Sequence, residues 1–422
     1  VSGISSATNV GMSFLSGGSA YTVLGTGYLS FVSGSMITAA APGTVNVRLE
    51  GVGFTKVGAA TLTLGGSNQM SGVVTISNGA VRLSDPWALG SSNGATVVAS
   101  GGELVAAVVA VPTYREPLTL SGSGTNNQGA LRFVTGSPTW VGTVTVVGAT
   151  TRIGADSGVS ATLSTVITGG VADVFAGGAG RLLVNGGVQL GSGKIVKDGT
   201  GVLSLRGSSA YSGGTIVSAG TLRVCGSCAA NVAGTATIRL ENGTVLGSES
   251  AASTIVNPLS IWGNVQLIDS SLSFNKDLTV TGAVDLNAAT RTITVPSAIA
   301  TLGGAISSGG ITKSGAGTLV LGGVNTYASA TTLSAGTLVH NGTNASSAVT
   351  TSAGTKLLGV GSMAATTVNG EIDPGAALST VGQLSMASLN LRPSSSIRVT
   401  ITNATASAGV NQDLINCVGT LT

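Results

Sequence analysis

Charged residues are scarce in this chain of 422 residues: Asp, Glu, Lys and Arg make up 8% of it, and the formal net charge is +3. The charges are scattered singly, so there is no basic stripe that could release counterions from nucleic acid or dock on anionic lipid. Aromatic residues account for only 3%, which argues against a propeller with aromatic-rich blades. The composition thus disfavours nucleic acid as a partner and does not fit an ordinary globular mixture.

Cysteine and histidine are nearly absent, with three and one in the whole chain. So few cysteines cannot staple a domain of this length, and one histidine excludes metal sites built on a histidine pair. Gly, Ser, Thr or Asn interrupts every apolar stretch within a few positions, so no transmembrane helix is expected. Because no phosphate-binding loop is complete either, we expect no cofactor and no metal.

Glycine, by contrast, is abundant, with 66 residues, and 42% of the chain is hydrophobic. A chain so rich in apolar residues and so poor in charge is expected to fold rather than remain disordered. Apolar residues alternate with Thr or Ser in many segments, such as 60–64 and 291–295, and this period of two indicates half-buried strands. Asn-Gly pairs, as at 78–79 and 242–243, indicate tight turns between them.

Three stretches repeat one pattern without a gap. Counted from a leading lysine, a glycine falls two residues on, leucines six and eight on, and a further glycine twenty-three on. Reuse of one unit in fixed register is typical of a solenoid, and we expect the leucines to point into its core. The residues that carry the pattern are Lys56, Gly58, Leu62, Leu64 and Gly79 in the first copy, Lys197, Gly199, Leu203, Leu205 and Gly220 in the second, and Lys313, Gly315, Leu319, Leu321 and Gly336 in the third.

Turn glycines recur about every 20 residues, which suits one coil of a parallel β-helix with coils about 4.8 Å apart. About 20 such coils would give a single elongated rod on the order of 100 Å long. We therefore predict an all-β fold, one β-solenoid domain over residues 1–422, with repeat units headed at 54–84, 195–225 and 311–341. Antiparallel hairpins of a sandwich are the alternative.

The third repeat, residues 311–327 followed by 333–338, resembles the autotransporter-associated β-strand repeat. The second copy keeps the Tyr-Ser-Gly-Gly-Thr corner of that family at 211–215, whereas the first has Ala59-Ala60 and Gln69-Met70 where the pattern has Gly and Tyr. Residues 370–422 resemble the closing region of such passengers. The resemblance implies a right-handed parallel β-helix, secreted to the extracellular space or cell surface of a diderm bacterium, and no enzyme.

The cysteines form one compact motif, Cys225-Gly226-Ser227-Cys228. A local disulfide is the favoured interpretation, because an exported chain meets oxidising conditions. Free or redox-active thiols and half of a metal site are the alternatives. Cys417 lies in an apolar strand segment, and we expect it to be a buried free thiol.

Other polar residues allow a functional and a structural interpretation. The repeat lysines could form a ligand-binding ladder, but the copies lie several coils apart, so we favour a polar strand flank that keeps the turn solvated. His340 precedes an Asn-Gly turn, and we expect an exposed turn residue rather than a catalytic base. We expect Tyr211 and Tyr327 to pack at corners rather than to form carbohydrate platforms.

Carboxylates could in principle meet across neighbouring coils, as in β-helical polysaccharide enzymes. The candidates Glu103, Glu116 and Asp173 show no paired spacing, so we expect them on the solvated surface. The sequence thus predicts a non-enzymatic extracellular adhesin or structural rod. A self-assembling subunit of an extracellular filament or sheath is the alternative, and a polysaccharide-degrading enzyme is disfavoured. The expected partners are copies of the chain itself, host or neighbouring-cell surface molecules, or extracellular matrix glycans.

Overall fold

The computed structural model describes residues 6–8, 11–17, 20–109, 111–229, 231–271, 276–378, 380–402 and 412–422. This part of the chain is almost entirely β-strand, with one short 3-10 segment, η1 (Thr125–Asn127). The chain divides into two compact units, Val1–Thr215 and Ile216–Thr422, and each is described by itself. Among the described residues, no helix is both long enough and apolar enough to cross a membrane.

The strands of the first unit are short. They are β1 (Ser6–Thr8), β2 (Met12–Phe14), β3 (Tyr21–Val23), β4 (Tyr28–Phe31), β5 (Met36–Ala39), β6 (Gly43–Val45), β7 (Arg48–Gly51), β8 (Thr55–Val57), β9 (Leu62–Leu64), β10 (Gln69–Met70), β11 (Val74–Leu83), β12 (Thr96–Ala106), β13 (Thr113–Tyr114), β14 (Leu118–Gly122), β15 (Leu131–Phe133), β16 (Thr139–Trp140), β17 (Val144–Ala155), β18 (Ser160–Leu163), β19 (Ile167–Thr168), β20 (Asp173–Gly177), β21 (Arg181–Val184), β22 (Val188–Gln189), β23 (Ile195–Lys197) and β24 (Val202–Leu205).

The second unit follows the same plan, and the boundary between the units falls within β25 (Thr215–Val217). Its strands are β26 (Thr221–Val224), β27 (Ile238–Leu240), β28 (Val245–Ser248), β29 (Ser253–Ile255), β30 (Leu259–Ile261), β31 (Val265–Leu267), β32 (Leu278–Val280), β33 (Val284–Asp285), β34 (Thr290–Thr294), β35 (Ile299–Leu302), β36 (Ile306–Ser307), β37 (Gly310–Ser314), β38 (Thr318–Leu321), β39 (Thr331–Leu333), β40 (Thr337–His340), β41 (Thr343–Asn344), β42 (Val349–Thr351), β43 (Lys356–Gly359), β44 (Ser362–Val368), β45 (Glu371–Pro374), β46 (Gln383–Leu391), β47 (Ser396–Ile397) and β48 (Leu414–Cys417).

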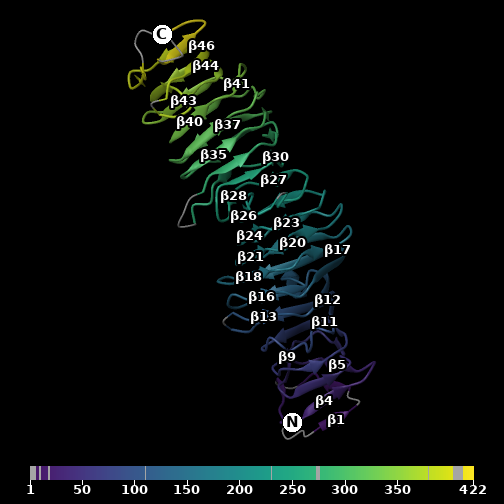
Figure 1. The fold of residues 1–422 in the computed structure, drawn as a ribbon. Coiled ribbons are helices and arrows are strands. Elements are labelled where there is room, and N and C mark those ends of the chain that lie inside the picture. Colours follow the sequence, from purple (N-terminus) through teal and green to yellow (C-terminus); the bar gives the residue numbers. More distant parts are fainter. Residues whose placement is uncertain are drawn as a thin grey trace. The chain divides into compact units, whose positions relative to one another are not determined.

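Within each unit, each strand pairs in parallel with a strand of the next coil, and Figure 1 shows these strands stacked as ladders. A parallel ladder needs a crossover between its strands, which the turns of each coil provide. The predicted parallel β-solenoid is therefore confirmed, and the antiparallel sandwich is wrong. The right-handed winding and the single elongated rod remain predictions.

The core of the first unit is built from columns of side chains, one from each coil. The register places each member of such a column directly against the next, and all members of the following column are at most 1% exposed. Burying each aliphatic side chain contributes about 1.5–3 kcal/mol, so the column repeats the same stabilisation coil after coil. The column contains Val45, Leu64, Leu83, Ala106, Phe133 and Ala155.

The second unit contains an equivalent column, again at most 1% exposed. Leu319 of the third repeat lies in its middle, so the repeat follows the same register as the core. The column contains Leu278, Ala300, Leu319, Leu338, Leu357 and Ile372.

The core also accommodates large aromatic rings. Tyr114 and Trp140 pair on successive coils of the first unit, and their ring centroids stack 4.9 Å apart. Both are at most 1% exposed. The indole Nε1 donates to the carbonyl oxygen of Glu116 at 2.8 Å. A stacked pair fits the narrow interior because the ring separation matches the spacing between coils.

Candidate functional site

The repeat lysines occupy core positions. In the first unit, Lys56 of β8 lies between Ile37 and Ile76 in the strand register. In the second unit, Lys313 lies between Ile293 and Leu333. Both lysines are 0% exposed, so each stands where neighbouring coils place an aliphatic side chain.

Each lysine carries its ammonium group to the corner of the coil, where backbone carbonyls accept its hydrogen bonds. The Nζ of Lys56 donates to the oxygens of Gly58 at 2.5 Å and Ala60 at 2.6 Å, and to Asn78 of the next coil at 2.6 Å. The Nζ of Lys313 donates to Ser314, Gly315 and Ala335 at 2.9, 2.7 and 3.0 Å. The lysine therefore crosslinks two successive turns.

The glycine twenty-three residues after the lysine makes room for this arrangement. Gly79 has a φ of 67°, and a Cβ there would lie 2.5 Å from the Nζ of Lys56. Any other residue at this position would be strained and would displace the ammonium group. The expectation that the repeat lysines form a solvated flank is wrong. Their aliphatic stems are buried and their ammonium groups bind backbone carbonyls of successive turns. Because they are buried, they do not belong to any ligand-binding surface.

Burial lowers the pKa of Lys56, Lys197 and Lys313 to about 8. Lys197 is 2% exposed and also donates to the carbonyl of its own turn, at Gly199. At neutral pH all three remain mostly protonated, since their pKa values stay above 7. The carbonyl oxygens thus receive charge-assisted hydrogen bonds.

Twelve residues after each lysine, a polar side chain accepts a hydrogen bond from a backbone amide. Asn68 accepts from the amide of Leu49 at 2.8 Å, Ser209 accepts from Val188 at 3.1 Å, and Asn325 accepts from Ile306 at 3.0 Å. These side chains are buried and are therefore structural.

The tyrosines of the repeat pack in the corners. Both are 1% exposed, and each phenol pairs with the threonine four residues on: Tyr211 with Thr215 at 2.6 Å and Tyr327 with Thr331 at 2.7 Å. The first repeat carries Met70 and Val74 at these two positions. The first repeat therefore lacks both hydroxyls, and in the other two repeats each buried hydroxyl has its partner.

Two of the three candidate carboxylates lie inside rather than on the surface. Glu103 is 2% exposed and lies 3.7 Å from Arg132, whose guanidinium also binds Asp156 at 2.7 Å on the following coil. Burial raises the pKa of Glu103, and Arg132 opposes that shift. The expectation that Glu103 is solvated is wrong, because neighbouring coils cover it. Arg132 contacts both carboxylates, so the cluster resembles a structural ion pair more than an acid and base pair.

Glu116 is likewise buried, at 5% exposed, and accepts a hydrogen bond from Thr96 Oγ1 at 3.2 Å. Burial raises its pKa to about 7. The solvated assignment is therefore wrong for Glu116 too. Asp173 is partly exposed and pairs with Lys194 at 3.0 Å.

His340 ends β40 at an inward position, following Val280, Leu302 and Leu321 in one column. It is 1% exposed, and no described residue forms a hydrogen bond with its Nδ1. Burial lowers its pKa to about 4. The expectation that His340 is an exposed turn residue is therefore wrong. It is the last residue of β40 and not part of the Asn-Gly turn. The imidazole is thus buried in the column of Val280, Leu302 and Leu321.

Cys225 and Cys228 form a disulfide, with Cα atoms 5.2 Å apart. Cys225 is 0% exposed, while Cys228 is exposed in the turn after β26. Cys417 is a free thiol that is only half-buried, so the expectation of full burial is wrong. In the described part of the chain, no group of three or more His, Cys, Asp or Glu side chains could hold a metal ion.

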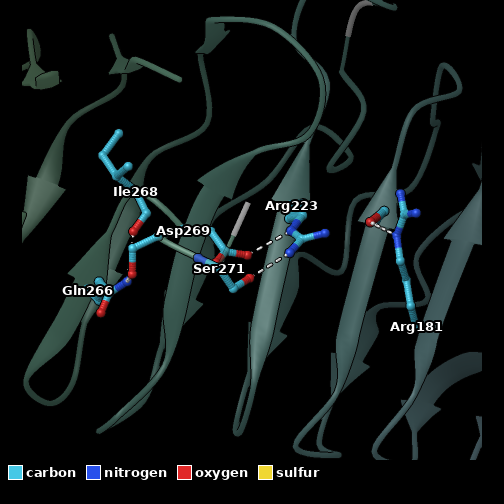
Figure 2. Close-up of polar contacts among 8 residues, drawn as sticks. Arg181, Arg223, Gln266, Ile268, Asp269 and Ser271 are labelled. Carbon is cyan, nitrogen blue, oxygen red and sulfur yellow. Dashed lines mark hydrogen bonds and ion pairs between the residues drawn. The ribbon is translucent and has the colours of Figure 1, made fainter. Parts of the chain in front are cut away.

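Figure 2 shows an ion pair of the second unit that the sequence analysis did not identify. The Nε of Arg223 lies 2.7 Å from Asp269, and its Nη2 donates to Ser271 at 3.0 Å. In the first unit, Arg152 binds Asp198 through two bonds of 2.7 and 2.9 Å. Each pair spans 46 residues, which two coils of about the expected length would produce.

Two exposed tryptophans share one arrangement, in which an arginine of the neighbouring coil lies over the ring. Trp262 is 42% exposed, and the guanidinium of Arg239 lies 3.6 Å from its ring centroid. Trp87 is 44% exposed, with Arg115 at 5.6 Å. Tryptophan and arginine are the residues enriched at binding hot spots. The sequence offered no signal for these pairs because coil stacking alone brings their members together.

The Arg239–Trp262 pair is held in place by its neighbours. Arg239 forms an ion pair with Glu241, and the indole Nε1 donates to the hydroxyl of Ser260 at 2.8 Å. Ring, guanidinium and hydroxyl project from β27, β30 and the turns that follow them, so the platform rests on strands. Such preorganisation lowers the entropic cost of binding.

Comparison with known proteins agrees with this architecture. The family described as passenger-associated-transport-repeat matches residues 54–83, 195–224 and 311–339. The chain is also 28% identical over 311 residues to "Adhesin BmaC autotransporter" of Brucella suis biovar 1 (strain 1330). That match covers 73% of this chain and 8% of the relative. No solved structure matches. The identification of autotransporter passenger repeats is thus confirmed.

Proposed function

We propose that this chain is a non-catalytic adhesin segment that acts at or outside the surface of a diderm bacterium. The observation that carries this function is the similarity over 311 residues to an autotransporter adhesin, together with three passenger repeats in register with the core. The β-solenoid presents its outward side chains on rigid strands, which suits adhesion to surface molecules of host or neighbouring cells.

The arrangement of polar groups supports a binding role over a catalytic one. Glu103 lies beside Arg132, His340 is buried in a column with Leu321, and the repeat lysines bind their own turns. These groups are therefore committed to the fold. The exposed tryptophans with their stacked arginines remain as contact points for a partner.

The function can be tested by displaying the chain on a non-adherent bacterium and measuring attachment to cultured cells and extracellular matrix. We expect attachment above the empty display strain, and a loss of about tenfold or more in the variant Trp87→Ala/Trp262→Ala, as hot-spot residues produce. The matched control is Val171→Ala/Val324→Ala, which truncates exposed apolar residues that lack an arginine. Equal attachment by the chain and the empty strain would overturn the proposal.

Electron microscopy of the purified chain separates this function from the filament hypothesis, which stays a prediction. Discrete particles agree with an adhesin segment, and long end-to-end fibres would favour a filament or sheath. Release of reducing sugar ends from polysaccharides would instead favour an enzyme.

A further inference from the structure

A groove of about 290 Å³ runs across three successive coils of the second unit. Its lining comes from β41, β44 and β46 and from the residues just before β41 and β44. All the residues that line it are uncharged. They are Asn341, Gly342, Thr343, Val360, Gly361, Ser362, Gln383 and Ser385.

The strand register aligns the polar side chains of the groove. Thr343 lies opposite Ser362, and Ser362 lies opposite Ser385, so three hydroxyls form a ladder along the coils. Asn341 and Gln383, each two residues before a ladder hydroxyl, add amide groups on the same side. The site is therefore a row of three hydroxyls on successive coils, flanked by the amides of Asn341 and Gln383 with Val360 on the coil between them.

The polar side chains of this groove have free hydrogen-bonding capacity. Among the described residues, Thr343, Ser362, Gln383 and Ser385 form no side-chain hydrogen bond, and Asn341 uses only its oxygen, accepting from Val360 at 3.3 Å. Aligned hydroxyls elsewhere do pair with each other, as Thr294 and Ser314 do at 2.8 Å. The groove thus presents donors and acceptors that the fold itself does not use.

We propose that this groove binds a neutral oligosaccharide, an inference that rests on the proposed adhesin function and adds a ligand site apart from the exposed tryptophans. Sugar hydroxyls donate and accept, and Ser, Thr, Asn and Gln side chains can do both in return. An anionic glycan would require lysine or arginine in the lining, and there is none.

A bound peptide strand fits this groove less well. Strand addition requires unpaired backbone amides and carbonyls. Here the amides of Thr343, Ser362 and Ser385 already donate to Gly323, Gly342 and Gly361 at 3.1, 3.0 and 3.0 Å. The backbone is saturated by the ladder, so recognition has to come from the side chains.

The test is an array of neutral and anionic oligosaccharides probed with the full chain, followed by calorimetry with the strongest neutral binder. We expect an affinity that changes less than about twofold between about 50 and 500 mM NaCl, since no charge pair is screened. The variant Thr343→Val/Ser362→Ala/Ser385→Ala should bind at least about tenfold more weakly, since it loses three hydrogen-bonding groups. Ser362→Tyr should also block binding by filling the groove.

The matched control is Thr312→Val/Thr332→Val/Thr350→Val, which removes an aligned ladder of the same sheet outside the groove. It should bind as the parent chain does, and unchanged melting temperatures show that the variants fold. Binding of anionic glycans or bare polypeptide alone, no neutral binder, or equal affinity in the groove variant would overturn the inference. Cell attachment that persists without glycan binding would sink this inference but leave the adhesin function standing.

Discussion

The guanidinium of Arg223 reaches across one whole coil to the carboxylate of Asp269. On the intervening coil, the residue opposite Arg223 is Gly247, and a Cβ there would come within 2.8 Å of Asp269. Arg152 and Asp198 also span one intervening coil in the first unit, where Phe175 lies opposite Arg152 and a Cβ at Gly177 would lie 2.3 Å from the guanidinium. Because neither glycine has a side chain, the arginine and the aspartate of each pair can meet above it.

The Arg223–Asp269 pair is buried, with side chains 7% and 5% exposed. We therefore expect Asp269→Asn to lower the free energy of unfolding by about 3 kcal/mol, since it leaves a buried cation unpaired. Arg223→Met/Asp269→Leu should cost clearly less. Urea unfolding of Arg223→Met, Asp269→Leu and the double variant measures the coupling free energy of the pair. Additive losses of stability would contradict the pairing.

The same pair predicts a response to acid. Burial opposes ionisation of Asp269, but hydrogen bonds from Ser271 and Arg223 outweigh it and hold its pKa below the usual value. Its contribution to stability is thus present above pH 3.8 and is lost as the pH falls further. Stability of the Asp269→Asn variant should vary less with pH below that value than stability of the parent.

The buried lysines make a prediction about the repeat itself. Lys56→Met should destabilise the chain by about 1–3 kcal/mol, because the carbonyls of Gly58, Ala60 and Asn78 lose their donor. Lys356→Met, at a side chain that is 38% exposed, is the control and should change little. Chemical denaturation at pH 7 compares the two, and equal losses would argue against the turn crosslink.

Glu116 should destabilise the fold when it ionises. Its pKa rises from 4.5 unfolded to about 7 folded, so stability falls as the pH rises from 4.5 to 7 and then levels off. Glu116→Gln keeps the oxygen that Thr96 binds and should stabilise the chain by up to about 3 kcal/mol at pH 8. At pH 4 it should have little effect. Melting curves at both pH values test this, and a pH-independent difference would contradict it.

His340 predicts the opposite dependence. Its pKa falls from 6.5 unfolded to about 4 folded, so stability is lost as the pH drops from 6.5 towards 4, by about 3 kcal/mol in all. His340→Leu, which matches Leu321 of the same column, should abolish that loss and be near neutral at pH 8. Denaturation at pH 8 and pH 5 is the measurement, and an unchanged acid sensitivity would show that other groups cause it.

The sequence by itself determined the fold class. Period-two alternation, regularly spaced turn glycines and the register of the three repeats are local properties, and each follows from strand geometry and backbone sterics. Leu62 and Leu64, with their counterparts in the other repeats, were predicted inside and are buried there. The sequence also shows a glycine twenty-three residues after each lysine. Only the structure shows that this glycine makes room for the lysine ammonium group, as at Gly79.

Only the tertiary structure decided which polar groups are inside and which meet. Coil lengths vary, so the partner of a residue such as Arg223 or Arg239 depends on how many residues each intervening turn consumes. Lys56, Glu116 and His340 appear solvated by residue type, yet stacking places their stems in the core. The physical reason is that burial in a solenoid depends on what lies on the coils above and below, and the sequence of one coil does not contain that information.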